Sequence, residues 1–346
     1  MNIGYILLAI LLFGAIIFIH ELGHYLFARL FHVTVKEFSI GMGPDLVTYV
    51  SKKTNIKYSL RMFPFGGYVS MVGEDEESDD ENALSKKPAW QRFIIVAAGA
   101  AMNILTGMLL TLVLMWNATP ASNVIAGFAD SPDSEVSSKD SGLAVGDLIV
   151  AVNGKSVHIA YETVYTIMHD AYETVDVTVI RDGERKTFAV DFPIVVDESG
   201  MVFGDSDIVF TREEKTVLGT LRHSFFYSLL TIRMVWESLG DLIFGRVSMD
   251  SVSGPIGITS EITNVAASGN YFGLLYLVIV ILMNVGVFNL LPIPAMDGGR
   301  LLFLLWEMIT RKPVPQKIEG LIHGIGLMLL LAIIVLISFK DIFSLF

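Results

Sequence analysis

The chain has 346 residues, of which 53% are hydrophobic, with a mean hydropathy of +0.59 and a formal net charge of −12. This composition is too apolar for an ordinary soluble domain and indicates a membrane protein with several spans and one small domain. The acidic balance argues against a nucleic-acid partner, which would require a basic face. The chain has no cysteine, so any metal must be held by histidine and carboxylate.

Four stretches are long and apolar enough to cross a bilayer about 30 Å thick. They run from about Asn2 to His32, Phe93 to Trp116, Tyr271 to Leu291 and Gly320 to Phe339. The first lacks the basic leader and the small-residue cleavage site of a signal peptide, so we expect it to be retained as a span.

Lysine and arginine gather in two of the connecting segments, residues 36–92 and 311–317. Because basic loops stay on the cytoplasmic side, we expect both segments to be cytoplasmic. The two termini and the region from Ala118 to Asn270 would then be extracytoplasmic.

The first apolar run ends in His20-Glu21-Leu22-Gly23-His24. Residues four apart share one face of a helix, so His20 and His24 can hold one metal ion while Glu21 acts on a water beside them. This is the arrangement of zinc hydrolases, here at the end of 18 uncharged residues, Asn2 to Ile19. The alternative is a polar cluster at the membrane boundary that binds no metal.

A zinc hydrolase needs three protein ligands and an open position for water. The stretch from Asn289 to Gly299 in the third span contains Pro292, Pro294 and Asp297. Its prolines stop a continuous helix and its glycines permit a tight turn, so Asp297 can point inward from a broken helix. Both spans would enter from the outside, so we expect His20 and Asp297 at similar depth, in the cytoplasmic half of the membrane.

The first cytoplasmic loop contains Phe63-Pro64-Phe65-Gly66-Gly67-Tyr68-Val69, an apolar and turn-rich segment too short to span. Residues 47–50 and 56–60 before it are β-prone, so we predict a hairpin that dips into the membrane beside the site. Such a hairpin could offer a strand edge to an extended substrate. Alternatively, it is an interfacial loop without a substrate role. The acidic run from Glu74 to Glu81 is interpreted as a solvated, mobile loop.

Charges return and apolar runs shorten between about Pro120 and Phe210, with turn signals at Asn153-Gly154 and Asp182-Gly183. Residues 174–180 alternate towards residues 186–192 across the second turn, which predicts a β-hairpin. We therefore expect a small β-rich domain here. Its segments 141–143, 146–149 and 152–155 resemble those of PDZ domains, which bind extended peptides by strand addition.

Apolar residues recur with helical periodicity from Val217 to Phe244, although Arg222, Arg233, Glu237 and Asp241 interrupt the stretch. We predict an amphipathic helix on the outer membrane surface rather than a fifth span. A fifth span would invert the third apolar span relative to the first and separate the two motifs.

The chain resembles the site-2 protease family of intramembrane zinc metalloproteases, in particular the bacterial RseP type with one PDZ domain. The likeness rests on His20-Glu21-x-x-His24, on Asn289-x-x-Pro292-x-Pro294-x-x-Asp297-Gly298 and on the PDZ-like insertion between them. Segments 41–44, 63–69 and 253–257 also look like family segments, whereas Met42 and the alanines of 99–103 depart slightly from it.

This resemblance implies a polytopic α-helical membrane protein with four transmembrane helices, a membrane-associated β-hairpin and one inserted β-rich PDZ domain. Residues 1–117 would form the first two spans with the hairpin loop, and residues 118–210 the PDZ domain. Residues 211–270 would form the surface helix and a linker, and residues 271–346 the last two spans.

The resemblance also implies the chemistry. His20, His24 and Asp297 would hold Zn²⁺, and Glu21 would take a proton from water and pass it to the leaving amine. Substrates would be single-span proteins already trimmed outside, such as anti-sigma factors, and remnant signal peptides. Cleavage would take place among the lipids of the bacterial inner membrane, and an outer PDZ domain could exclude substrates that are still untrimmed.

Several further residues are assigned provisional roles. Asn289 is interpreted as a ligand of the substrate backbone, and Pro292, Pro294, Gly66 and Gly67 are also assigned to substrate binding.

Two polar residues elsewhere in the spans have structural interpretations. Asn103 is expected to form a hydrogen bond between helices, and His323 to be a packed or interfacial residue. Two rival functions stay open: a catalytically inactive membrane adaptor that holds peptides through its PDZ domain, and a transporter with a broken third span. The absence of an internal repeat in the sequence weakens the transporter.

Overall fold

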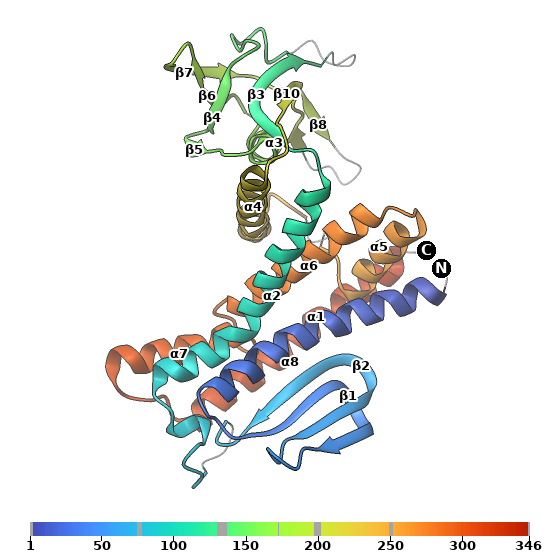
Figure 1. Cartoon of the computed structure of the whole chain (residues 1–346), viewed down its shortest axis with the longest axis vertical. Helices are drawn as coiled ribbons and strands as arrows, with labels where there is room; N and C mark the ends of the chain where they lie inside the picture. The colour runs from blue at the N-terminus through green and yellow to red at the C-terminus, as the bar shows by residue number, and fades with distance from the viewer. Residues whose placement is uncertain are drawn as a thin grey trace. The chain divides into compact units, whose positions relative to one another are not determined.

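The computed structural model describes residues 3–74, 78–129, 137–171, 173–196, 202–248 and 252–344 (Figure 1). The helices are α1 Ile3–Leu30, α2 Ala89–Asn117, α3 Ala160–Asp170, α4 Val217–Ile243, α5 Pro255–Ala267, α6 Tyr271–Leu290, α7 Asp297–Thr310 and α8 Gln316–Ser344. The strands are β1 Val35–Val50, β2 Lys57–Met71, β3 Ala121–Phe128, β4 Leu148–Val152, β5 Lys155–Ser156, β6 Val175–Arg181, β7 Glu184–Val190, β8 Ile194–Val196, β9 Val202–Gly204 and β10 Ile208–Arg212.

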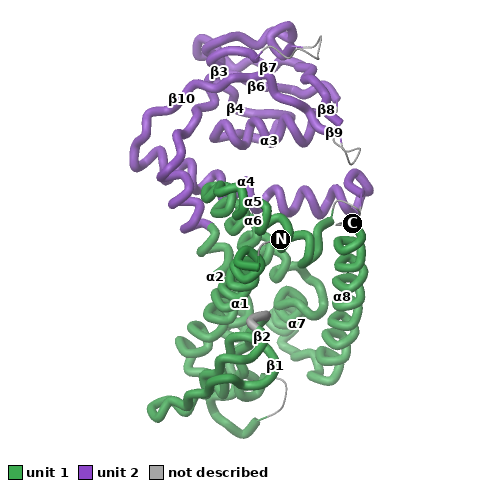
Figure 2. Tube along the Cα trace, turned by 90° about the vertical axis from the view of Figure 1, so that its right-hand side faces the viewer, with its two compact units in different colours: residues 1–107, 252–346 green, residues 108–251 purple. Residues whose placement is uncertain are grey.

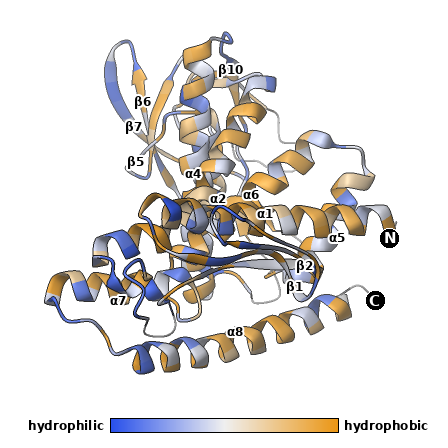
Figure 3. Cartoon of the chain, turned by 60° about the horizontal axis from the view of Figure 1, so that its bottom comes forward, coloured by the Kyte–Doolittle hydropathy of each residue, from blue (hydrophilic) through white to orange (hydrophobic). Residues whose placement is uncertain are grey.

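Among the described residues, four helices, α1, α2, α6 and α8, are long and apolar enough to cross a membrane. The length and apolar composition of these helices confirm the four spans expected from the sequence. The most apolar window of α8 has none of its residues buried in the protein. Figure 3 shows apolar residues along most of that helix. A helix that is apolar on every side and uncovered by protein is suited to contact with lipid.

The chain divides into two compact units, residues 1–107 with 252–346 and residues 108–251 (Figure 2). Unit 1 holds three of the apolar helices, most of α2, and the sheet formed by β1 and β2. Its largest buried cluster lies where α1 packs against that sheet. The cluster consists of Ala28, Val33, Val35, Phe38, Ile56, Val69, Met71, Leu84 and Ile95.

β1 and β2 form a sheet in which both strands bend. Residues 37–40 are in register with residues 57–60 and also with residues 67–70, while residues 47–50 pair with residues 57–60. Residues 67–70 therefore form an edge of the sheet. We expected residues 63–69 to make the hairpin itself, but they lie within β2. The connection between the strands falls near Asn55, whose φ of 52° asparagine tolerates well.

A half-buried carboxylate, that of Glu37, connects several residues of this sheet. Glu37 forms ion pairs with Arg61, at 3.0 Å, and with Lys57, at 3.4 Å. Burial opposes ionisation of Glu37, but hydrogen bonds from Ser59, Tyr68 and Arg61 outweigh it and hold the pKa of its carboxyl at about 2. Because these partners come from both halves of β2, Glu37 fixes the bend of that strand.

Unit 2 contains a sheet with the strand order β10-β3-β4-β6-β7, to which β5 is added beside β4. The predicted hairpin is confirmed, because β6 pairs with β7 across Asp182 and Gly183, whose φ values are 54° and 80°. β8 and β9 form a separate pair. The core of the unit is lined by Ile125, Leu143, Ile149, Val152, Val157, Ile167, Ala171, Val175, Val177, Val179, Val190, Phe192 and Ile208.

The helix expected over residues 217–244 is confirmed as α4, which belongs to unit 2. Its polar side is buried, as Thr220 and His223 show with exposed fractions of 3% and 1%. Its apolar side is open, with 77% of Leu218 and 51% of Trp236 exposed. This is the reverse of a soluble amphipathic helix, which buries its apolar stripe.

Candidate metal centre

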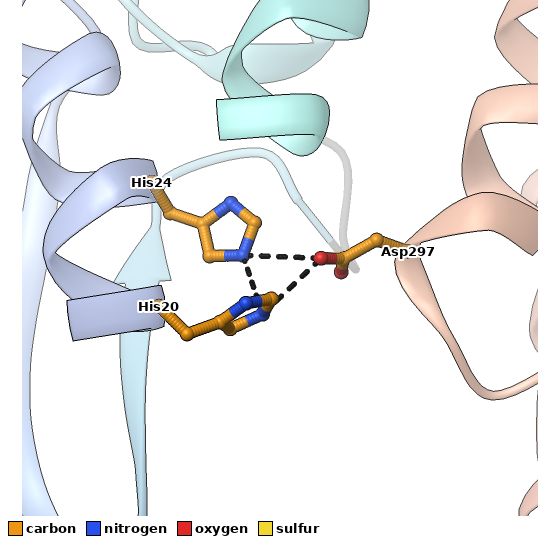
Figure 4. Close-up of side chains that lie close together, drawn as sticks. All are labelled: His20, His24 and Asp297. Atoms are coloured by element: carbon orange, nitrogen blue, oxygen red, sulfur yellow. Dashed lines mark hydrogen bonds and ion pairs between the residues drawn. The ribbon is translucent and has the colours of Figure 1, made fainter. Parts of the chain in front are cut away.

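Two histidines of α1, in unit 1, are the first candidate metal ligands. α1 is continuous from Ile3 to Leu30, so His20 and His24 lie one turn apart on the same face. His20 is only 9% exposed. The two Nε2 atoms are 3.2 Å apart, and both point to the same place (Figure 4).

Asp297 reaches this place from the first residue of α7. α6 ends at Leu290, and the residues between the helices include Pro292 and Pro294, which have no backbone N–H to continue a helix. Ala295 then adopts a left-handed φ of 79°. This turn directs the carboxylate of Asp297 to the histidines.

The three side chains form a nearly equilateral triangle of ligand atoms. Asp297 Oδ2 lies 3.2 Å from His20 Nε2 and 3.3 Å from His24 Nε2. A tetrahedral zinc ion bound at about 2.0–2.2 Å sets its ligand atoms about 3.3 Å apart. Within the described part of the chain, this is the group of His and carboxylate side chains that could hold a metal ion. Its nitrogen and oxygen donors fit zinc, with a fourth position left for water.

The surroundings favour that use of the imidazoles. His24 Nδ1 is 2.9 Å from the carbonyl oxygen of Ile95, which favours a proton on Nδ1 and leaves Nε2 free to bind a metal. Gly99 of α2 packs directly against the rings: a Cβ there would lie 2.3 Å from His24 Nε2 and 2.8 Å from His20 Cε1. Only glycine therefore fits beside the histidines in this arrangement.

Glu21 lies next to the triangle and next to the edge of the β1–β2 sheet. Glu21 is close enough to His20, His24 and Asp297 for electrostatic interaction with all three. A Cβ at Gly67 would lie 3.2 Å from Glu21 Cγ and 2.8 Å from the carbonyl oxygen of Ser39. The edge segment 67–70 therefore approaches the acid more closely than a residue with a side chain would allow.

The other residues singled out from the sequence have varied surroundings. Asn289 donates from Nδ2 to the carbonyl oxygen of Val285, at 2.9 Å, on its own helix. Asn103 is fully buried, yet neither side-chain polar atom has a hydrogen-bond partner among the described residues, so the expected bond between helices is not seen. Gly66 has a φ of 81° at the bend of β2.

Sequence reasoning missed some contacts near the site. The acidic run was interpreted as solvated, but Glu74 forms an ion pair with Arg300 of α7, at 2.5 Å. Residues 75–77 of that run lie outside the described residues. His323 accepts a hydrogen bond from the Ala295 N–H. Arg300 follows Asp297 by one helical turn, which was the available signal for the ion pair, whereas no local pattern pointed to the contact of His323.

Comparison with known proteins agrees with this chemistry. The model of the Peptidase family M50 matches residues 8–333. The chain belongs to this family, that of the site-2 proteases. A protein of Clostridium acetobutylicum, provisionally named a zinc metalloprotease, is 34% identical over 97% of both chains. A similarly named protein of Fusobacterium nucleatum is 35% identical over 98% of this chain and 99% of the relative.

A third relative carries a more specific name. The regulator of sigma-W protease RasP of Bacillus subtilis is 26% identical, with 100% of both chains covered. The M50 protein described here is thus a zinc metalloprotease, and its four apolar helices make it a multi-pass membrane protein.

Proposed function

We propose that this M50 protein is an intramembrane zinc endopeptidase that cleaves transmembrane segments of single-span proteins already trimmed outside the membrane. The observation that carries the proposal is the triangle of His20, His24 and Asp297. The histidines lie on α1, which is apolar enough to span, and Asp297 lies on α7, just after α6, a second such helix. A hydrolytic centre at this depth has little access to soluble peptides, so its substrate would come from the lipid phase.

The roles of the residues follow from their chemistry. His20, His24 and Asp297 would hold zinc, which when bound supplies a Lewis acid that activates water and polarises a carbonyl group. Glu21 would accept the proton of the attacking water and deliver it to the nitrogen of the departing amine.

The edge segment 67–70 is the proposed docking strand for substrate. A helix in lipid hides its peptide bonds, so the substrate must unwind before hydrolysis. An extended substrate could then pair with the free edge of β2, which the close approach of Gly67 brings beside Glu21. Gly66 would permit the bend that exposes this edge.

The interruption between α6 and α7 would form the opposite wall. Pro292 and Pro294 would keep the backbone out of a helix there, and Asn289 would bind the substrate backbone. The Nδ2 atom of Asn289 already donates to Val285, so the carbonyl Oδ1 is the atom we assign to an N–H of the substrate.

We further propose the domain organisation and topology. Residues 1–117 and 271–346 would hold the paired spans, residues 118–210 an extracytoplasmic PDZ domain, and residues 211–270 a surface helix and linker. The start of α1 and the end of α8 lie near each other in Figures 1 and 3, which supports an even number of crossings. The open apolar side of α4 is suited to the outer lipid surface.

The substrates we propose are anti-sigma factors and remnant signal peptides in a bacterial inner membrane. The name of the Bacillus subtilis relative, regulator of sigma-W protease, supports the first class. The PDZ domain would exclude untrimmed substrates. Deleting residues 120–205 should then allow cleavage of a substrate that keeps its outer domain, and continued protection of that substrate would count against this gating.

The test of the main proposal compares wild type with Glu21→Gln on a model transmembrane substrate in detergent. The variant should remain folded and zinc-loaded and yield no cleaved fragment, and mass spectrometry of the wild-type fragments would identify the bond. Fragments that form equally with Glu21→Gln would indicate an inactive adaptor and a contaminating protease.

A further inference from the structure

The turn that carries Asp297 to the histidines depends on one side chain from another helix. Four residues between α6 and α7 have a backbone N–H. Three of these groups bond within the turn: Leu291 to Phe288, Ile293 to Leu291 and Met296 to Ile293. The fourth, Ala295 N–H, donates instead to Nδ1 of His323 on α8, at 3.0 Å.

Ala295 is also the strained residue of the turn. Its φ of 79° is a conformation that alanine rarely adopts, and Asp297 follows two residues later. A strained conformation persists only where its surroundings hold it in place. The hydrogen bond from Ala295 to His323 is the polar contact that ties the backbone of this residue to α8.

The turn before Asp297 packs closely against α8 near His323. Gly326, one turn later on α8, faces Pro294 so closely that a Cβ would lie 2.4 Å from Pro294 Cβ. The imidazole itself is held by Phe303 of α7, whose ring meets it edge-on with centroids 5.8 Å apart. His323 and Gly326 therefore form one contact surface for residues 294–295, on a helix whose most apolar window has no buried residue.

We propose that His323 is a positioning residue for the metal centre: by holding Ala295 N–H it fixes the turn that places Asp297 opposite His20 and His24. This inference rests on the ligand set of the proposed function and extends it to α8. His323 touches neither the ligand atoms nor the substrate, and acts through the backbone of residues 295–297.

The test uses the full-length zinc-loaded protein in detergent and the rate at which a chromophoric chelator removes zinc. In His323→Leu, which has similar bulk but no acceptor, zinc loss should be roughly 10–100-fold faster, the range for lost outer-shell contacts. Asn has its Oδ1 at the same bond distance from Cα as His Nδ1, so His323→Asn should stay within a few-fold of wild type. Met328→Ala, at a position 70% exposed on the same helix, is the matched control.

Two further measurements separate positioning from general stability. With zinc saturating, His323→Leu should lower kcat while leaving KM for the model substrate nearly unchanged. In Gly326→Ala the added methyl group pushes α8 away from Pro294, so this variant should also lose zinc faster than wild type. It replaces His323→Leu as the test variant if His323→Leu does not fold. Wild-type zinc retention in both variants, or equally fast loss in His323→Leu and His323→Asn, would overturn the inference.

Asp297→Ala, measured in parallel, tests the proposed ligand set separately from the positioning role of His323. If Asp297→Ala retains zinc as wild type does, the ligand set of the proposed function is wrong and this inference falls with it. If Asp297→Ala loses zinc while His323→Leu retains it, only the positioning role is wrong.

Discussion

Each unit of the molecule contains a cluster of histidine and aspartate, and the two clusters differ in how their polar atoms are arranged. In unit 1, His20, His24 and Asp297 direct their ligand atoms to one point. In unit 2, His169 of α3 lies between two carboxylates, with Nδ1 2.6 Å from Asp170 and Nε2 2.9 Å from Asp241 of α4. Both ring nitrogens of His169 are therefore occupied.

Cations complete the cluster in unit 2. Lys155 lies 3.2 Å from Asp170 and 3.3 Å from Glu237, and Arg233 lies 3.0 Å from Glu237. Donors and acceptors alternate, so each of these carboxylates is paired with a lysine, an arginine or the imidazole of His169. Among the described residues, no lysine or arginine forms an ion pair with Asp297, and the three ligand atoms all present lone pairs. Convergent lone pairs, and not residue type, distinguish a metal site from an ion-pair network.

The largest effect should come from removing a ligand in unit 1. His24→Ala should lower bound zinc from about one ion per chain to near zero and abolish cleavage, because two ligands do not make a stable zinc site. His169→Gln in unit 2 should leave zinc content and cleavage at wild-type levels. Metal analysis of both purified variants checks this contrast, which fails if His169→Gln also loses zinc.

A smaller effect is expected from Gly99→Ala, which changes no ligand. The added Cβ would lie 2.3 Å from His24 Nε2, so the ring or α2 must move. We expect zinc binding to weaken by roughly 10–100-fold, as for other changes that misplace a ligand. Chelator competition measures this. Gly324→Ala, at an open position of α8, is the control and should bind zinc normally. Unchanged affinity in Gly99→Ala would mean that the packing around the imidazoles does not constrain them.

The two halves of the unit 1 site differ in how far the sequence predicts them. His20 and His24 lie on one unbroken helix, so their spacing alone gives their relation. Asp297 could be proposed from its residue type and expected depth. The prolines also predicted the broken helix before Asp297, but the contact between Ala295 and His323 could not be derived, because it depends on where α8 packs. The bend of β2 was missed for the same reason: residues 37–40 pair with two distant segments, and local patterns do not encode such a register.

In unit 2, Asp241→Asn should destabilise without affecting the metal. The variant weakens the acceptor for His169 Nε2 and removes one charge that joins α3 to α4. We expect a loss of about 1–3 kcal/mol in the local stability of α3, the usual range for disrupting a hydrogen bond to a charged group, and nearer its lower end because the pair is half-buried. Hydrogen exchange of residues 160–170 in the full-length protein measures it. The exposed Asp176→Asn is the matched control, and equal protection in both variants would contradict the structural role of the network.

The smallest effect is a dependence of the unit 2 cluster on pH. The hydrogen bond to Asp170 raises the pKa of His169 above its ordinary value of 6.5, with a further contribution from Asp241, although burial opposes the shift. A raised pKa means that the folded state binds the proton more tightly than the unfolded state. The stabilisation is therefore complete below pH 6.5 and is lost as the pH rises through the pKa of folded His169. The carboxylates of Asp170, Asp241 and Glu237 face the imidazole ring, and the Tyr165 ring stacks on it. Exchange protection of α3 should fall by on the order of 1 kcal/mol or less between neutral and alkaline pH, because the cluster is only half-buried. The same experiment on His169→Gln should show no such slope, and a slope that survives in that variant would assign the pH dependence to another group.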